Sequence, residues 1–213
     1  MSSRTRLYLI TPPALAPQAF AGRLGEALAG GGVASLQLRL EGADEAAWRR
    51  AAEVLRPICQ AADVAFVIND KPRLAAELGA DGVHLGPHDM PIREAREIVG
   101  FDRVIGFSAG DSKHAAFEAG QAGADYVAFG AFFPSPTKDT GRRADLSLIE
   151  DWAAISEVPC VAIGGLRPEN CGPVVRAGAD LVAVSSAVWT HPEGPGAAVR
   201  AFRRAFREAE RQA

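Results

Sequence analysis

The amino-acid sequence predicts an α/β fold in which short strands alternate with helices, and three observations support this prediction. The tripeptide Gly-Ala-Asp recurs at residues 79–81, 123–125 and 178–180, each time between a helical pattern and an apolar run. The apolar runs are short and nearly continuous, as in parallel strands that are covered on both faces. Eight such runs occur along the 213 residues.

The recurring tripeptide indicates how each helix passes into the next strand. Gly79, Gly123 and Gly178 suit the left-handed position that follows the last turn of a helix. Because the same joint is used three times, one supersecondary unit is being repeated along the chain.

Strands are expected near residues 6–10, 33–39, 64–68, 81–85, 103–107, 125–130, 159–163 and 180–184. Eight strands, each followed by a helix or helical turn, predict a (β/α)8 TIM barrel that forms a single domain over residues 1–213. The alternative is an open doubly wound sheet. The barrel is preferred because polar residues follow many different strands, whereas an open sheet usually gathers its site at one switch point.

Several helices can be placed between these strands. A helix over 44–61 has one apolar face, formed by Trp48, Ala52, Leu55 and Cys59. Pro57 should bend or end that helix, and Pro72 and Pro168 stand where a first helical position is expected. The last helix, about 196–211, has Val199, Phe202 and Phe206 on one side.

Composition excludes several classes of protein. The chain is 48% hydrophobic and 23% charged, as in ordinary globular proteins, and its net charge of −3 argues against binding to nucleic acid. No apolar run approaches the roughly 20 residues that span a bilayer, and the N-terminus has too few apolar residues for a signal peptide. The odd number of cysteines, Cys59, Cys160 and Cys171, predicts buried thiols in a reducing cytoplasm.

Polar residues follow seven of the expected strands. In chain order they are Gln37 and Arg39, Asn69 and Asp70, Asp89, Ser108, then Ser135, Thr137 and Lys138, Gly164 and Gly165, and finally Ser185 and Ser186. Each has an ordinary structural explanation, since such residues cap helices and form turns. In a barrel, however, all of them line the same mouth, which favours a functional site there.

The residue types indicate two sites for anions. Asp70 and Asp89 supply the hard oxygen ligands of a Mg²⁺ site, which needs one or two carboxylates plus substrate phosphate and water. Arg39 and Lys138 are cations suited to phosphate oxygens. The glycines and serines after the last two strands stand where barrels commonly bind phosphate through backbone N–H groups.

No arrangement of serine or cysteine with histidine indicates a protein nucleophile. His84 is expected to point from its strand into the barrel or its mouth. His88, His114 and His191 are interpreted as surface or loop residues.

Six stretches resemble the thiamine phosphate synthase family over nearly the whole chain. They are LQLRLE (36–41), INDKPRLAAELGADGVHLGPHDMP (68–91), IGFSA (105–109), FGAFFPSPTKDT (129–140), AIGGLRPEN (162–170) and AGADLVAVSSAV (177–188). The resemblance implies a transferase of thiamine biosynthesis, which joins a hydroxymethylpyrimidine diphosphate to a thiazole phosphate and releases pyrophosphate.

The resemblance also implies roles for individual residues. Asp70 and Asp89 would hold Mg²⁺ on the diphosphate. The pyrimidine diphosphate would be held by Gln37, Arg39, Asn69 and Lys138, and Ser108 would lie against the pyrimidine and the departing diphosphate. The thiazole phosphate would meet Ser135, Thr137, Gly165, Ser185 and Ser186. Small barrels of this kind often pair, so a homodimer is compatible with the sequence.

One position departs from the family pattern. The family's second-strand motif is Gln-x-Arg-x-Lys, whereas this chain has Glu41 at the last position. A cation that binds pyrophosphate has therefore become an anion. One reading is that Glu41 turns to solvent while Arg142 or Arg143 supplies the charge.

Two other functions stay open at this point. A thiazole tautomerase would keep the barrel and the thiazole phosphate site, but Asp70, Asp89 and Lys138 argue against it, and residue 131 is alanine where a histidine would be needed. Glu41 is the best support for the tautomerase. A non-catalytic paralogue that binds thiamine phosphate or pyrophosphate is the third possibility, and it too is suggested by Glu41 in place of the family lysine.

Overall fold

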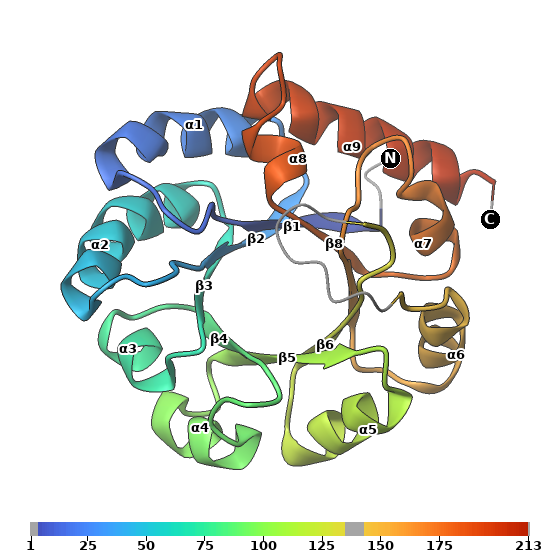
Figure 1. The fold of residues 1–213 in the computed structure, drawn as a ribbon, viewed down its shortest axis with the longest axis horizontal. Helices are drawn as coiled ribbons and strands as arrows, with labels where there is room; N and C mark the ends of the chain where they lie inside the picture. The colour runs from blue at the N-terminus through green and yellow to red at the C-terminus, as the bar shows by residue number, and fades with distance from the viewer. Residues whose placement is uncertain (1–3, 135–142, 213) are drawn as a thin grey trace.

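The computed structural model describes residues 4–134 and 143–212. In this part of the chain, strands β1–β8 form a closed parallel barrel in sequence order, and the helices surround it (Figure 1). The strands are Arg6–Ile10, Val33–Leu38, Ala65–Asn69, Gly82–Leu85, Val104–Gly110, Tyr126–Phe129, Cys160–Ile163 and Leu181–Val184. Each overlaps the strand expected from the sequence, so the predicted (β/α)8 barrel is confirmed and the open sheet is not formed.

Alternation along the strands creates two apolar layers. In β1, Leu7 and Leu9 are fully buried in the large cluster between barrel and helices. Tyr8, between them, belongs to a smaller cluster inside the barrel, together with Tyr126, Ala128 and Val161. Since successive side chains of a strand point to opposite faces, one short apolar run serves both layers.

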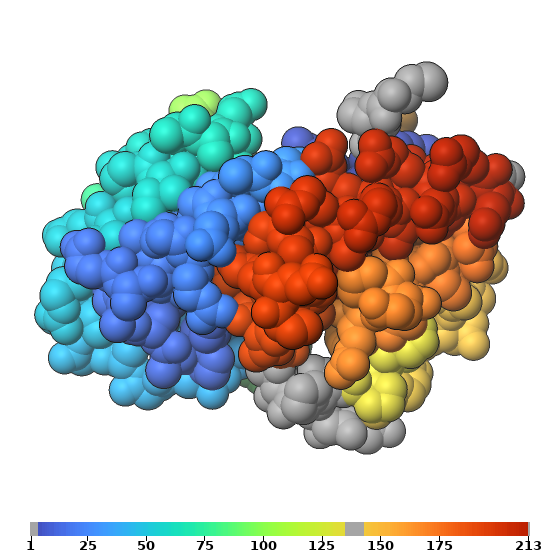
Figure 2. Space-filling view, turned by 90° about the horizontal axis from the view of Figure 1, so that it is seen from above, coloured from blue at the N-terminus to red at the C-terminus, as the bar shows by residue number. Residues whose placement is uncertain are grey.

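The helices between the strands are α1 (Pro17–Ala29), α2 (Glu45–Ala61), α3 (Pro72–Glu77), α4 (Ile92–Val99), α5 (Lys113–Ala122), α6 (Ser147–Ile155) and α7 (Gly172–Arg176). After β8 come the short α8 (Ser186–Trp189) and the long α9 (Pro195–Glu210), which buries Val199, Phe202 and Phe206 as predicted. Figure 2 shows the C-terminal segment against the N-terminal part of the chain, where β1 pairs with β8 and α9 packs on α1.

The structure confirms some of the helix boundaries predicted from prolines and not others. Pro72 begins α3 as predicted. Pro57 does not end α2, which continues to Ala61 because the face containing Leu55 and Cys59 stays buried. The expectation for Pro168 was wrong: it lies in a turn, and α7 begins only at Gly172.

The Gly-Ala-Asp joints have the predicted left-handed glycines, with φ of 63°, 99° and 105° at Gly79, Gly123 and Gly178. Their aspartates add a second function. The carboxylates of Asp81, Asp125 and Asp180 accept hydrogen bonds from the backbone N–H of Phe66, Ile105 and Cys160, at 2.7, 2.7 and 2.9 Å. The aspartates before β4, β6 and β8 therefore fix the beginnings of β3, β5 and β7. In each case the two strands are neighbours in the barrel.

The three cysteines are free and buried, as expected. Burial raises the pKa of the Cys59 and Cys171 thiols to about 12 and that of Cys160 to about 11. Within the described ranges, no helix is long and apolar enough to cross a membrane.

Candidate active site

A cavity of about 690 Å³ opens at the carboxyl ends of the strands, a size typical of small-molecule sites. Nine of the twelve residues predicted for the site line it: Gln37, Arg39, Asn69, Asp70, Asp89, Ser108, Gly165, Ser185 and Ser186. The other three, Ser135, Thr137 and Lys138, lie outside the described residues, as does Arg142. His84 also lines the cavity, and His88 is exposed at its edge.

Asp70 and Asp89 converge from two different loops. Asp70 follows β3 with a left-handed φ of 60°, and its backbone N–H donates to the carbonyl of His84 at 2.8 Å. Asp89 is held by the backbone N–H of Gly86, at 2.7 Å from Oδ2. A left-handed aspartate is uncommon and costs some backbone strain, and such residues cluster at functional sites.

The two carboxyl groups lie within hydrogen-bond reach of each other. Partial burial and the neighbouring Asp89 carboxyl raise the pKa of Asp70 to about 6, and the nearby Arg39 and Lys71 oppose the rise. Among the described residues, no group of three or more His, Cys, Asp or Glu side chains could enclose a metal by itself. Two repelling carboxylates with open space beside them therefore fit a hard divalent ion that takes its remaining ligands from substrate and water.

A second group of contacts holds the ends of β2 and β3. Gln37 donates through Nε2 to Oδ1 of Asn69 at 2.7 Å, and both side chains are buried. Thr11, which sequence reasoning missed, is 2% exposed. Its hydroxyl accepts from the Arg39 backbone N–H at 2.9 Å and donates to the Arg39 carbonyl at 3.0 Å. The backbone beneath Arg39 is thus fixed from two sides.

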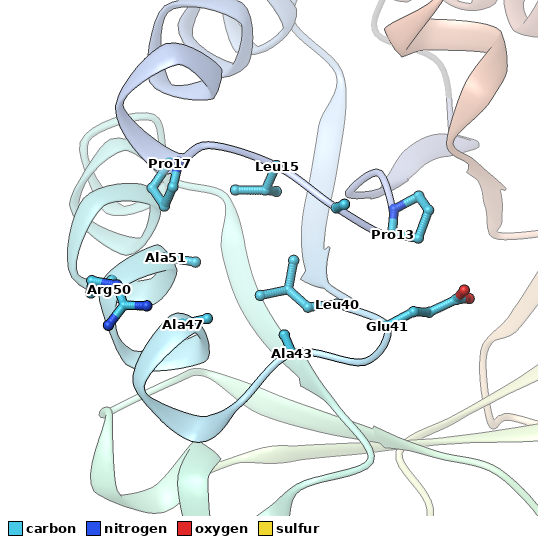
Figure 3. A pocket seen from close by; sticks show the side chains of 10 residues that line it. Pro13, Leu15, Pro17, Leu40, Glu41, Ala43, Ala47, Arg50 and Ala51 are labelled. Atoms are coloured by element: carbon cyan, nitrogen blue, oxygen red, sulfur yellow. The ribbon is translucent and has the colours of Figure 1, made fainter.

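Arg39 is paired with Glu41. Nη2 of Arg39 lies 2.7 Å from Oε1 of Glu41, and the two side chains are 29% and 57% exposed. Figure 3 shows Glu41 at the edge of a small surface hollow beside Leu40, with its carboxylate directed away from that hollow. Glu41 is therefore largely in solvent, as one reading of the sequence had it, but it also occupies the guanidinium that was expected to bind diphosphate.

The loops after β6 and β7 approach closely. Gly164 and Gly165 have φ of 101° and 62°, and a Cβ on Gly165 would lie 2.3 Å from the carbonyl oxygen of Pro134. Only glycine fits both the conformation and the space. Asn170, another residue without a predicted role, donates to the Gly165 carbonyl at 3.0 Å. Ser185 donates to the Thr11 carbonyl at 3.3 Å, so the end of β8 is tied to the residue that follows β1.

Four polar side chains connect the barrel interior to the cavity. The Tyr8 and Tyr126 hydroxyls are 2.9 Å apart, the Tyr126 hydroxyl is 3.0 Å from Nδ1 of His84, and Nε2 of His84 is 2.8 Å from the Ser108 hydroxyl. Burial lowers the pKa of His84 to about 4 and raises the pKa of both phenols well above the usual value of tyrosine. All three groups are therefore neutral near pH 7. Sequence reasoning placed His84 correctly but missed both tyrosines.

A family model for thiamine monophosphate synthase matches residues 7–188. The chain belongs to the thiamine monophosphate synthase family.

Individual members of the thiamine monophosphate synthase family match along nearly their full length. The thiamine-phosphate synthase of Rhodospirillum centenum is 56% identical over 202 residues, which is 95% of this chain and 98% of that relative. The thiamine-phosphate synthase of Hyphomonas neptunium is 51% identical over 208 residues, 95% of this chain and 94% of the relative. The solved structure of thiamine phosphate pyrophosphorylase from Pyrococcus furiosus superposes with a TM-score of 0.84 at 34% identity, covering 97% and 98% of the two chains.

Proposed function

We propose that this protein is a thiamine-phosphate synthase. It joins 4-amino-2-methyl-5-hydroxymethylpyrimidine diphosphate to 4-methyl-5-hydroxyethylthiazole phosphate and releases pyrophosphate. The observation that carries the proposal is the convergence of Asp70 and Asp89 in one cavity with Arg39, Gln37 and Asn69. The family membership and the naming of relatives at up to 56% identity support it.

Asp70 and Asp89 are the residues that would hold Mg²⁺. The ion, when bound, neutralises part of the charge that collects on the diphosphate as it leaves.

The reaction breaks the bond between the pyrimidine methylene carbon and the diphosphate oxygen, and it forms a bond from that carbon to the thiazole nitrogen. An electron-rich pyrimidine allows the leaving group to depart ahead of attack, so the methylene carries positive charge in between. Such a reaction needs alignment of the thiazole nitrogen and stabilisation of the departing anion. It needs no protein nucleophile, although the cavity does hold one serine beside a histidine, Ser108 at 2.8 Å from Nε2 of His84.

The residues divide between the two substrates by position. Gln37, Arg39 and Asn69 would bind the pyrimidine diphosphate on the side of β2 and β3, and Ser108 would face the departing group. Gly165, Ser185 and Ser186 would bind the thiazole phosphate on the side of β7 and β8. Lys138 would join the first group and Ser135 and Thr137 the second, although these three lie outside the described residues. The location we propose is the cytoplasm, where the free cysteines would stay reduced.

Incubation of the protein with both substrates and Mg²⁺ tests the proposal. We expect thiamine phosphate and pyrophosphate to form in equal amounts, and formation of neither would contradict it. If the protein instead isomerised a thiazole phosphate without the pyrimidine partner, it would be a tautomerase. Binding of thiamine phosphate without turnover would identify the non-catalytic paralogue.

A further inference from the structure

Tyr8, Tyr126, His84 and Ser108 form a hydrogen-bonded series. The geometry decides in which direction the protons are donated along it. Tyr8 and Tyr126 are 3% and 7% exposed, and they pack in the cluster inside the barrel. His84 stacks on Tyr126 with ring centroids 5.6 Å apart. Three side chains held this way leave little freedom to rotate, so each proton must lie between two particular atoms.

Three arrangements of the protons turn all three contacts into hydrogen bonds. In the first, Tyr8 donates to Tyr126, Tyr126 donates to Nδ1 of His84, and Nε2–H of His84 donates to Ser108. In the second, every donor and acceptor is exchanged, so that Ser108 donates to Nε2 and Tyr126 donates to Tyr8. In the third, Ser108 donates to Nε2, and the Tyr126 oxygen accepts from both Nδ1–H and Tyr8. A neutral imidazole has one N–H and therefore permits one arrangement at a time.

The second arrangement leaves the Tyr8 O–H without an acceptor, and the third leaves the Tyr126 O–H without one. Within the described residues, the hydroxyl of Tyr8 has no hydrogen-bond partner other than Tyr126. Ser35, which stands opposite Tyr8 in the neighbouring strand, does not accept it, because the buried Ser35 hydroxyl has no partner itself. A buried donor without an acceptor has given up its hydrogen bond to water and gained none in return, which is unfavourable. The first arrangement pairs every buried donor of the series and leaves only a lone pair of Tyr8 unused.

We propose that Tyr8, Tyr126 and His84 are positioning residues, which hold the His84 proton on Nε2 so that the Ser108 hydroxyl is turned into the cavity as a hydrogen-bond donor. Resting on the proposed function, the acceptor is an oxygen of the departing diphosphate, whose charge grows as the carbon–oxygen bond breaks. A donor fixed before the reaction stabilises that charge without reorganisation.

In a general base–nucleophile pair, the histidine accepts the proton of the serine. Here His84 donates to Ser108, so the pair has the opposite role. At 2.8 Å the two side chains have the separation of such a pair. However, an imidazole that donates through Nε2 cannot take the serine proton. The group behind Nδ1 is a neutral phenol, whereas a carboxylate there would hold the opposite proton arrangement.

The protonation site can be measured without substrate. Protein labelled with ¹⁵N in histidine is studied by NMR near pH 7.5, and the His84 signals are assigned by comparison with the other histidines, using His114→Gln as a reference variant. We expect the neutral tautomer with the proton on Nε2, and a proton on Nδ1 would overturn the proposal. Tyr8→Phe should keep this tautomer, since Tyr126 still has Nδ1 as its acceptor. Tyr126→Phe removes the hydrogen-bond donor to Nδ1, so the proton should no longer be held on Nε2. A tautomer unchanged in Tyr126→Phe would also overturn the proposal.

Kinetics then tests the consequence for Ser108. Loss of one positioned donor to a developing charge lowers kcat by about 10²-fold or more, so Ser108→Ala is expected to do so. Tyr126→Phe should lower kcat about tenfold in the native protein and have no further effect in Ser108→Ala, because both changes remove the same interaction. Equal effects of Tyr126→Phe in both backgrounds would refute the link. His114→Gln, on the outer surface, is the control expected to keep native kcat.

Because the tautomer is read from the protein alone, the inference and the proposed function fail separately. An inactive protein with the Nε2–H tautomer would refute the synthase activity and leave the proton arrangement standing. An active synthase with the Nδ1–H tautomer would refute the arrangement alone.

Discussion

Replacing Glu41 by glutamine should tighten the binding of pyrimidine diphosphate and of pyrophosphate. In the free protein, Glu41 pairs with Arg39 at 2.7 Å. An anion that binds the same guanidinium must share it with this carboxylate or displace it. Glutamine keeps the size of the side chain and removes its charge, so the guanidinium becomes fully available and a nearby repulsion disappears.

The size of the effect follows from the geometry. A phosphate oxygen on the guanidinium would add a second hydrogen-bond length of about 3 Å, which places it roughly 6 Å from the Glu41 carboxylate. One unit charge at that distance contributes about 2.8 kcal/mol at a dielectric of about 20 and about 0.7 kcal/mol in water. The Glu41 side chain is 57% exposed, so we expect an intermediate value of about 1–2 kcal/mol, or about 5- to 30-fold in affinity.

Inhibition by pyrophosphate, measured in the presence of Mg²⁺, is the direct assay. Glu41→Gln should lower the inhibition constant by the factor given above, and Glu41→Lys should lower it further. Glu45→Gln is the matched control, since it removes the same charge from the exposed start of α2, where Glu45 pairs with Arg49. If neither Glu41 variant binds pyrophosphate more tightly than Glu45→Gln does, the electrostatic reasoning is wrong.

Three further predictions concern the carboxylate pair and the barrel. Without metal, the raised pKa of Asp70 contributes stability that is complete below about pH 4 and is lost as the pH rises through about 6. Asp89→Asn removes part of the increase in the Asp70 pKa, so the melting temperature of this variant in EDTA should fall less between pH 5 and 7.5 than that of the native protein. Parallel melting curves for the two proteins would contradict this. Asp180→Ala should lower the free energy of unfolding in urea by about 1–3 kcal/mol, because it leaves a buried backbone N–H unpaired, while Asp180→Asn, which keeps an acceptor oxygen, should lose less. Gly106→Ala would place a Cβ 1.9 Å from the Tyr126 ring, so the ring must move; stability should fall by about 1–3 kcal/mol and kcat should fall with it, and a native kcat would show that the position of Tyr126 does not matter.

The barrel and most of its strand boundaries could be predicted because local signals repeat. Gly79, Gly123 and Gly178 each mark a helix end that only a residue tolerant of positive φ can form, and the structure has all three in that conformation. Once the strands were placed, the polar residues after them could be assigned to one mouth by the geometry of the fold alone. This explains why Asp70 and Asp89, nineteen positions apart in sequence, could be expected in the one cavity that both of them line.

Residues whose role depends on distant partners could not be predicted in this way. Tyr8 and Tyr126 meet across the barrel interior although 118 residues separate them. The available signal was a phenol on an inward-facing strand position, which requires a hydrogen-bond partner when buried. Pro168 was misplaced for a local reason, because the Asn170 side chain accepts from the Arg167 backbone N–H at 2.7 Å and stabilises a turn before the helix begins.

The pairing of Glu41 with Arg39 was also beyond the sequence, which showed the change of charge without its contact. Two side chains on the loop after one strand can turn toward each other or apart. The backbone conformation of the loop decides which of the two orientations occurs. Thr11 holds the Arg39 backbone with two hydrogen bonds. With the backbone in this position, the Arg39 guanidinium lies within reach of the Glu41 carboxylate.

Calorimetric titration of pyrophosphate into the protein, with Mg²⁺ and with EDTA, tests most directly whether Asp70 and Asp89 bind the leaving group through a divalent ion. We expect tight binding by the native protein that depends on Mg²⁺, and binding by Asp70→Asn and Asp89→Asn that is weak and indifferent to it. Binding by both variants with the native affinity and the native dependence on Mg²⁺ would contradict the account.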